Sequence, residues 1–156
     1  MKIGICGASG YLGWKLFNYF TVDKMGTYCN NYKPGLVKFD LRTDDFSIFD
    51  KCSFVVILSA YAKIQFCEDN RQEAYDLNVR HTERLLEYLH SKGIRSLFIS
   101  SDASIRPNTF YGLCKREVDY YIKQRKLNSQ SLVPVGKFDK DKLEEFCMIV
   151  KRRANV

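Results

Sequence analysis

The chain has 156 residues, of which 46% are hydrophobic and 14% aromatic, so it is long enough to bury a substantial core and too apolar to be disordered. It contains no run of 18 apolar residues, which argues against a membrane-spanning helix. The N-terminus enters an apolar segment directly, without the basic region of a signal peptide, so we expect a cytoplasmic protein. Six cysteines without C-x-x-C spacing are interpreted as reduced thiols and predict neither a disulfide framework nor a zinc site: 6, 29, 52, 67, 114 and 147.

The net charge of +7 comes partly from three basic clusters, Lys115–Arg116, Lys123–Lys126 and Lys151–Arg153. A basic surface can attract nucleic acid, but no nucleic-acid motif accompanies these clusters. We therefore interpret the charge as solvated helix faces with some attraction for anionic cofactors and substrates, and we expect no nucleic-acid partner.

The first thirteen residues carry the clearest motif. The apolar run Ile3 to Cys6 predicts a buried strand, which is followed by Gly7, Gly10 and Gly13 and then by an amphipathic stretch. In a dinucleotide site Gly7 would allow a tight turn, Gly10 would let backbone N–H groups reach a pyrophosphate, and Gly13 would let the helix pack closely. The alternative is a glycine-rich turn in another doubly wound protein, because the spacing is G-x-x-G-x-x-G.

The remaining segments alternate between strand and helix patterns. This alternation predicts an α/β fold, a Rossmann-type doubly wound parallel sheet with right-handed crossovers, in a single domain over residues 1–156. We expect strands near 27–29, 36–41, 53–58, 95–100 and 131–135, and helices near 11–21, 44–51, 67–91, from 107–108 onward, and 141–153.

The end of the second strand is the position that meets the adenosine ribose in a dinucleotide fold. An acid there binds the 2′-OH of NAD, whereas a basic group suits the 2′-phosphate of NADP. The residues after that strand are Asn30, Asn31, Tyr32 and Lys33, with no acid among them. We therefore expect NADP(H) to be favoured over NAD(H), with Asn30 and Lys33 near the ribose.

Tyr111 and Lys115 form the second motif. Residues four apart share a helix face, so the Lys115 ammonium can approach the Tyr111 phenol and lower its pKa toward a useful range for acid–base catalysis. Ser101, at the end of the fifth strand, can hold a substrate oxygen beside Tyr111, and Asn78 can bridge Lys115 to water. The alternatives are a chance Tyr-x-x-x-Lys, a strand cap at Ser101 and an exposed Asn78. The two histidines, His81 and His90, suggest no metal site.

Seven elements in order resemble the extended short-chain dehydrogenase/reductase family, above all sugar-nucleotide epimerases, dehydratases and dTDP-4-dehydrorhamnose reductases. The resemblance covers about residues 1 to 125. Its elements are the glycine turn, Phe39–Leu41, Leu58–Ala60, Cys67–Glu68, Asn78–Val79, Ser100–Asp102 and Tyr111-Gly-x-x-Lys115.

The resemblance implies a role for each matching residue. The pyrophosphate would lie on the turn, Asp40 and Leu41 would meet the adenine, and Ser59 and Ala60 the ribose–nicotinamide side. Lys115 would hold the nicotinamide ribose, and Tyr111 would exchange a proton with a sugar oxygen during hydride transfer. The implied catalytic set is Ser101, Tyr111, Lys115 and Asn78, and the implied cofactor contacts are Gly7, Ser9, Gly10, Tyr11, Leu12, Gly13, Asn30, Lys33, Asp40, Leu41, Ser59, Ala60, Tyr111 and Lys115.

The chain departs from the family pattern in two places. Only Asp102 to Phe110 separate Ser101 from Tyr111, and 41 residues follow Lys115, where relatives continue much further into a substrate domain. Val133 to Lys137 resembles a remnant of the strand that leads into that domain. We therefore expect a largely absent substrate region and an apolar surface that favours a homodimer or a partner subunit.

Two functions remain open from the sequence. The first is an NAD(P)-dependent oxidoreductase or epimerase that acts on a carbonyl or alcohol of a nucleotide-linked sugar or another small carbonyl compound. The alternative is a non-catalytic NAD(P)-binding subunit or sensor that works through a protein partner.

Overall fold

The computed structural model describes residues 1–43, 45–134 and 136–156. Its centre is a six-stranded sheet in the order β3-β2-β1-β4-β5-β6, in which every pair is parallel. The strands are β1 (Ile3–Cys6), β2 (Lys24–Tyr28), β3 (Val37–Lys38), β4 (Phe54–Ile57), β5 (Arg95–Ile99) and β6 (Ser129–Leu132). The Rossmann-type α/β fold predicted from the sequence is therefore confirmed.

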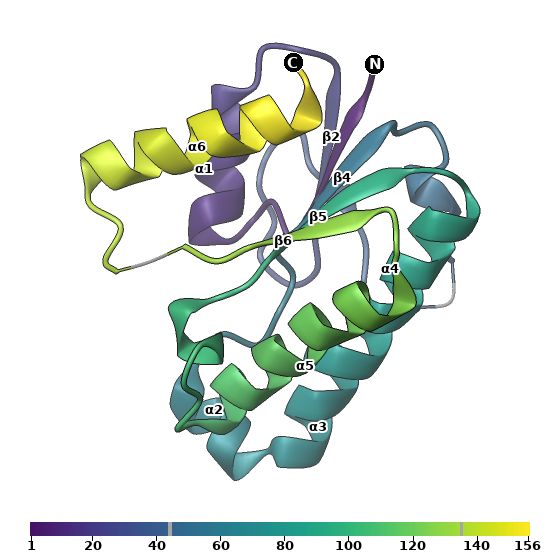
Figure 1. Ribbon diagram of the computed structural model, residues 1–156. Coiled ribbons are helices and arrows are strands. Elements are labelled where there is room, and N and C mark those ends of the chain that lie inside the picture. The colour runs from purple at the N-terminus through teal and green to yellow at the C-terminus, as the bar shows by residue number, and fades with distance from the viewer. Residues whose placement is uncertain (44, 135) are drawn as a thin grey trace.

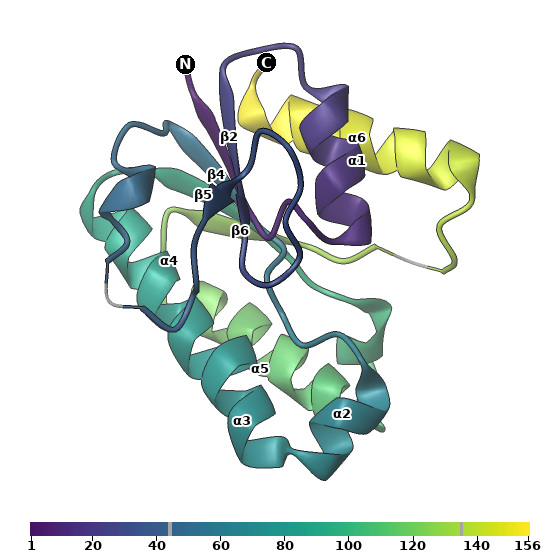
Figure 2. The same ribbon diagram turned by 180° about the vertical axis from the view of Figure 1, so that it is seen from behind.

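Helices cover both faces of this sheet, with α1 and α6 on one side and α3, α4 and α5 on the other (Figure 1, and from behind in Figure 2). The helices are α1 (Tyr11–Tyr19), α2 (Ile64–Asp69), α3 (Arg71–Tyr75), α4 (Thr82–Ser91), α5 (Phe110–Arg125) and α6 (Lys140–Ala154). Short helical turns are η1 (Ser47–Phe49), η2 (Asp76–His81) and η3 (Asp102–Ser104).

Two hydrophobic cores result, because successive side chains of a strand point to opposite faces. Ile3 and Ile5 of β1 lie in the core under α1 and α6, whereas Cys6 belongs to the core under α4 and α5. All four residues of β1 and of β4 are buried, as expected for central strands of a parallel sheet.

The strand order places a switch point between β1 and β4. From β1 the chain continues to β2 on one side, and β4 begins the opposite half of the sheet. Ligands of open α/β sheets bind in the crevice outside the carboxyl ends of such strands. The glycine turn after β1 and the segment after β4 meet at this crevice.

The predicted helix over 67–91 is wrong as a single element. The segment folds as α2, α3, the π-helical turn η2 and α4, with a break at Asn70, whose φ and ψ of −128° and 53° are not helical. The apolar stripe of Ala74, Leu77, His81, Leu85 and Leu89 runs across η2, so hydrophobic periodicity did not reveal the change.

Smaller differences concern segment lengths. The strand expected over 36–41 forms only at β3, and the helix expected over 44–51 is the single turn η1. Asp44 in that helix, and Val135 in the predicted sixth strand, lie outside the described residues. The closing helix and the helix that carries Tyr111 agree with the prediction to within a few residues.

In the described ranges no helix has both the length and the apolar character needed to cross a membrane. Those same ranges contain no cluster of three or more His, Cys, Asp or Glu residues that could hold a metal ion. All six cysteines are free, and five of them are buried.

Candidate functional site

The glycine turn has the geometry that its spacing predicts. Gly7 has a φ of +89°, and a Cβ there would lie 2.7 Å from the Ser59 nitrogen. A Cβ on Gly13 would lie 2.3 Å from the Gly7 carbonyl oxygen, so only glycine lets α1 pack this closely on the turn. Gly10 differs, because a Cβ there meets nothing closer than 3.6 Å. The open space beside Gly10 is a cradle at the N-terminus of α1, where backbone N–H groups favour an anion.

A cavity of ≈310 Å³ extends from this cradle toward β2 and β3. Asp40, Leu41 and Asn30, expected at the adenosine end, line it, and so do Ser59 and Ala60, expected on the ribose–nicotinamide side. The other lining residues are Gly7, Ser9, Gly10, Cys29, Asn31, Phe39, Arg42, Leu58, Tyr61 and Leu77.

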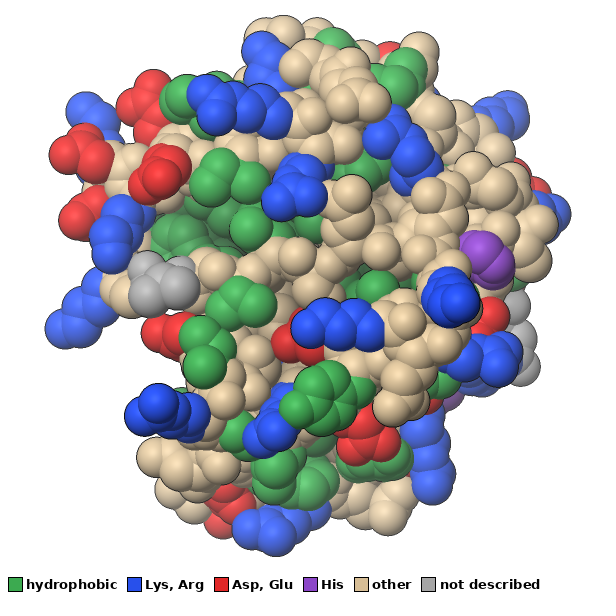
Figure 3. Space-filling model, in the orientation of Figure 1, with side chains coloured by type: hydrophobic (Ala, Val, Ile, Leu, Met, Phe, Trp, Pro, Cys, Tyr) green, Lys and Arg blue, Asp and Glu red, His purple; other side chains and the backbone are tan. Residues whose placement is uncertain are grey.

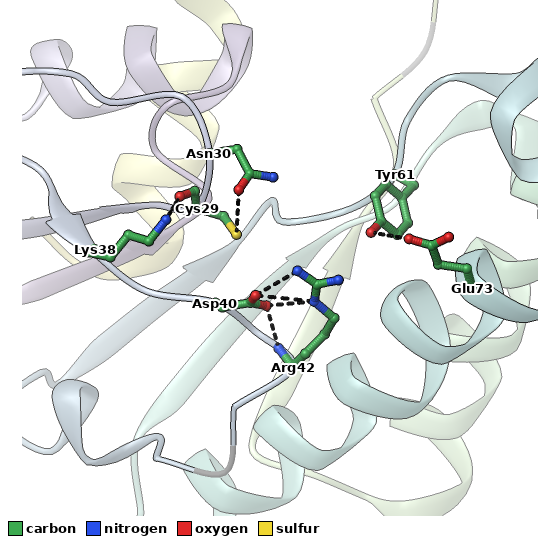
Figure 4. A network of polar contacts seen from close by, with 7 residues as sticks. All are labelled: Cys29, Asn30, Lys38, Asp40, Arg42, Tyr61 and Glu73. Carbon is green, nitrogen blue, oxygen red and sulfur yellow. Dashed lines mark hydrogen bonds and ion pairs between the residues drawn. The ribbon is translucent and has the colours of Figure 1, made fainter.

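Arg42 is a member of this cavity that sequence reasoning missed. Its guanidinium forms a bidentate ion pair with the Asp40 carboxylate, in which Nη2 donates to Oδ2 at 2.7 Å and Nε donates to Oδ1 at 2.9 Å (Figure 4). The hydrogen bond from Arg42 is the largest cause that lowers the pKa of Asp40 to about 2. Arg42 directly follows the Asp40–Leu41 motif, and that adjacency was the available signal.

The loop after β4 closes the cavity through Tyr61. Its phenol donates a hydrogen bond to Glu73 Oε1 at 2.9 Å, which connects the loop to α3 across the crevice from Asp40 and Arg42 (Figure 4). On the other side, the Lys38 ammonium donates to the Cys29 carbonyl, and the Cys29 thiol donates to Asn30 Oδ1 at 3.7 Å.

A second cavity of ≈260 Å³ adjoins the first one. It is lined by Tyr111 and Lys115 of α5 and by the N-terminal residues Tyr11, Leu12 and Gly13 of α1. Four residues line both cavities and so join them into one groove: Gly7, Gly10, Leu58 and Ala60.

Tyr111 lies at the far end of the groove, whereas Ser101 lines neither cavity and directly follows Ser100, which does. Burial is the largest cause that raises the pKa of Tyr111, and a hydrogen bond with the Ser101 side chain opposes it. The pKa of Tyr111 is therefore raised, not lowered as expected, and Lys115 is not among the groups that shift it. The reason is geometric, because the Lys115 ammonium lies 5.8 Å from the centre of the Tyr111 ring and donates to the Ile99 carbonyl at 2.9 Å.

Ser101 also fills the capping role that was its alternative interpretation. Its hydroxyl accepts a hydrogen bond from the Ala103 backbone nitrogen at 3.2 Å and so caps η3. The hydroxyl donates its one proton to Asp102 Oδ1 at 3.3 Å, which leaves its second lone pair to accept from the Tyr111 phenol.

Asn78 lies at a different place from the one expected. Its side chain is buried in η2, where Oδ1 accepts from the Tyr61 nitrogen at 2.8 Å and Nδ2 donates to the Tyr61 carbonyl at 3.0 Å. The predicted bridge from Asn78 to Lys115 is therefore not the contact that the structure shows. Both ends of the amide instead anchor the loop that lines the groove.

The start of the Tyr111 helix is held from α2. Glu68 Oε1 accepts a hydrogen bond from the Phe110 nitrogen at 2.7 Å, and Arg71 pairs with Glu68 Oε2 at 2.7 Å. The hydrogen bond from the Phe110 nitrogen is the largest cause that lowers the pKa of Glu68. The sequence motif Cys67–Glu68 pointed to this position without indicating its contact.

Lys33 is the predicted cofactor residue that lies apart from the groove. Its ammonium stacks over the Trp14 ring at 4.6 Å, on the side of α1, and it does not line either cavity. Asn30 alone of that predicted pair lines the adenosine end.

The chain matches a family model in sequence and solved structures in fold. The family model of the RmlD substrate binding domain matches residues 1–108. No curated protein sequence matches the chain.

Solved structures of similar fold come from several organisms. A hypothetical dTDP-4-dehydrorhamnose reductase from Sulfolobus tokodaii is 23% identical at a TM-score of 0.72, over 85% of this chain and 54% of that one. A UDP-glucose 4-epimerase with UDP-glucose from Thermotoga maritima is 15% identical at 0.70, over 85% and 54%. A dTDP-4-dehydrorhamnose reductase from Bacillus anthracis in complex with NADP is 15% identical at 0.70, over 99% and 71%.

The chain thus spans about half the length of the first two of these structures, whose likeness shows a shared fold. The family match covers more than two thirds of the chain and includes the glycine turn, Asp40–Leu41 and Ser101. The chain therefore belongs to the RmlD substrate binding domain family.

Proposed function

We propose that the protein binds a nicotinamide dinucleotide along the groove and uses it to reduce or oxidise a carbonyl or alcohol of a nucleotide-linked sugar. The observation that carries this proposal is the junction of the two cavities at Gly7 and Gly10. The junction joins the Asp40–Leu41 end to the Tyr111–Lys115 end in a single groove.

The residues present fit such a cofactor. The open cradle at Gly10 suits the pyrophosphate, since any side chain there would fill it. Asp40 and Leu41 would hold the adenine, Ser59 and Ala60 would line the path to the nicotinamide end, and Lys115 would hold the nicotinamide ribose. When bound, the nicotinamide ring supplies or accepts the hydride.

Tyr111 is the candidate general acid–base group. A raised pKa keeps its phenol protonated at neutral pH, so it is suited to donate a proton to a carbonyl oxygen in the direction of reduction. Ser101, hydrogen-bonded to that phenol, would orient the same oxygen. Solved structures of similar fold that are named as dTDP-4-dehydrorhamnose reductases and a UDP-glucose 4-epimerase support this substrate class.

The test is a spectrophotometric assay of NADPH consumption with dTDP- and UDP-linked keto-sugars. Turnover with any of these compounds supports an enzyme. Binding of NADPH without turnover supports the second candidate, a non-catalytic nucleotide-binding subunit or sensor. The specific observation that favours this second candidate is the orientation of Lys115 toward Ile99 rather than toward the phenol.

We propose further that NADPH binds more tightly than NADH. No acid follows β2, and the Arg42 guanidinium lies in the same cavity as Asn30, where it would meet a 2′-phosphate.

We expect a larger thermal shift with NADPH than with NADH at equal concentration, since bound ligand raises stability as RT ln(1 + [L]/Kd). Arg42→Gln should reduce the NADPH shift and leave the NADH shift nearly unchanged. Equal shifts in the parent would contradict the preference.

We also propose that the protein is cytoplasmic, which its six free cysteines support, and that it works as a homodimer or with a partner subunit. Exposed apolar side chains support the assembly, among them Tyr11, Ile64, Ile105 and Leu113. On the face shown in Figure 3, apolar side chains gather over α6 and the end of β6, and Lys and Arg are scattered between other residues.

Sedimentation velocity should give a species heavier than the 18.2 kDa monomer. A clean monomer at high concentration, with no co-purifying protein, would argue against assembly.

A further inference from the structure

Asp119 lies one helical turn after Lys115 on the same face of α5. Its carboxylate is held from β5, because the Ser100 hydroxyl donates a hydrogen bond to Oδ2 at 2.7 Å. Among the described residues its other oxygen, Oδ1, has no hydrogen-bond partner although it is buried. A buried carboxylate oxygen without a donor is costly unless a nearby positive charge compensates it.

Lys115, one helical turn earlier on the same face of α5, is the candidate for that positive charge. Its side chain is only 4% exposed, and its ammonium lies between the Ile99 carbonyl, 2.9 Å away, and the Phe98 ring, 4.6 Å from the ring centre. Neither of these neighbours carries a formal charge. An ammonium buried in this way loses its proton readily unless a negative charge lies close to it.

The titratable groups that act on Lys115 come from two elements. Cys67 of α2 and Cys114 and Asp119 of α5 oppose the effect of burial, which lowers the pKa of Lys115 to about 8. Burial raises the pKa values of Cys67 and Cys114, so both thiols are neutral at neutral pH. Tyr111, the remaining titratable neighbour on α5, also has a raised pKa and is neutral. Asp119 is thus the only carboxylate among these groups in the described chain.

We propose that Asp119 is a positioning residue that acts through Lys115, keeping this buried ammonium charged at the wall of the groove so that it can hold the cofactor ribose. The inference rests on the proposed function, since it takes Lys115 as the group that binds the cofactor. Ser100 connects this pair to the site, because it lines the same cavity as Lys115 and precedes Ser101.

The requirement for a counter-charge increases when the groove is filled. A dinucleotide bound in the groove would exclude water from the Lys115 ammonium, and loss of water favours the neutral amine. A fixed carboxylate behind the ammonium opposes this effect without occupying the cavity. Asp119 lines neither cavity of the groove, so it can act on the cofactor only through residues that do, which are Lys115 and Ser100.

The first readout is the affinity for NADPH, measured by fluorescence titration from neutral to alkaline pH. In the parent the affinity should fall as pH rises through the Lys115 pKa of about 8, because the neutral amine is a weaker ligand. Asp119→Asn should move this fall to lower pH by about one unit, the small end of the effect of a nearby opposite charge. Asp119→Glu, which keeps the charge, should restore the parent profile. Glu117→Gln removes the same charge from the same helix and should leave the profile unchanged, because Glu117 is not among the groups that act on Lys115.

The second readout needs no cofactor. Urea unfolding at neutral pH is compared for the parent, Asp119→Asn, Lys115→Met and the double variant. In the parent, Asp119→Asn should lower the urea midpoint, because Lys115 loses its counter-charge. In the Lys115→Met background the same substitution should lower the midpoint much less, because no ammonium is left to lose that counter-charge.

The outcomes separate the two proposals. A pH profile that Asp119→Asn leaves in place, or an equal loss of urea midpoint with and without Lys115, would overturn the role of Asp119. If the parent binds no NADPH at any pH, the proposed function fails, and the urea comparison alone decides whether Asp119 acts through Lys115.

Discussion

Replacing Tyr111 with Phe should lower NADPH-dependent turnover of a nucleotide-linked sugar by ~10²–10⁴-fold, the usual contribution of general acid–base catalysis. The substitution removes the phenol oxygen and keeps the ring, which packs at the start of α5. Affinity for NADPH should change little, because the groove is otherwise intact. Initial rates and an NADPH titration of both proteins measure the two quantities separately.

Tyr120→Phe is the matched control for this experiment. Tyr120 is on the same helix, is 47% exposed, and its hydroxyl accepts a hydrogen bond from Arg116 Nη2 at 2.6 Å, outside both cavities of the groove. Its replacement should leave the turnover rate close to that of the parent. An active parent whose rate survives Tyr111→Phe would refute the assignment of Tyr111 as the general acid–base group.

Replacing Gly10 with Glu should abolish the stabilisation of the protein by NADPH. A Cβ on Gly10 meets no atom closer than 3.6 Å, so the backbone tolerates a side chain and the unliganded protein should unfold near the parent temperature. The carboxylate would then occupy the cradle at the N-terminus of α1 and repel a pyrophosphate. Thermal unfolding with and without NADPH measures this effect.

Gly10→Gln separates bulk from charge, since it adds a side chain of the same size without the negative charge. We expect it to weaken the NADPH shift less than Gly10→Glu does. A full NADPH shift in Gly10→Glu would show that the cofactor does not bind on the glycine turn.

The local motifs were predictable because short-range physics determines them. The Gly7 turn needs a positive φ and the Gly13 contact needs a missing Cβ, and the spacing of the glycines after an apolar strand indicates both. The cavity residues Asp40, Leu41, Ser59 and Ala60 were predicted from the resemblance, and the groove brings them together. The parallel sheet was predictable because its strands alternate with helices.

Long-range contacts explain what the sequence did not reveal. The four-residue spacing places Lys115 and Tyr111 on one helix face. The Lys115 ammonium nevertheless donates its hydrogen bond to the Ile99 carbonyl, which is 16 positions away on β5. In the same way, Asn78 binds the Tyr61 backbone instead of facing Lys115. No local pattern encodes such partners.

Charged residues near the groove were missed for a related reason. Arg42 lines the adenosine cavity, while Lys33, the predicted cation, stacks on Trp14. Both follow a short strand by a few residues, and only the path of the loop decides which one enters the cavity. The break at Asn70 was hidden because it lies in a run of six polar residues, 68–73, where no apolar periodicity distinguishes a continuous helix from an interrupted one.

The groove through Gly7 and Gly10 is proposed to bind a nicotinamide dinucleotide, and calorimetric titration of the parent protein with NADPH measures this binding. We expect saturable binding at one site per chain, with heat that disappears in Gly10→Glu. The absence of heat in the parent, or equal binding by the parent and Gly10→Glu, would contradict it.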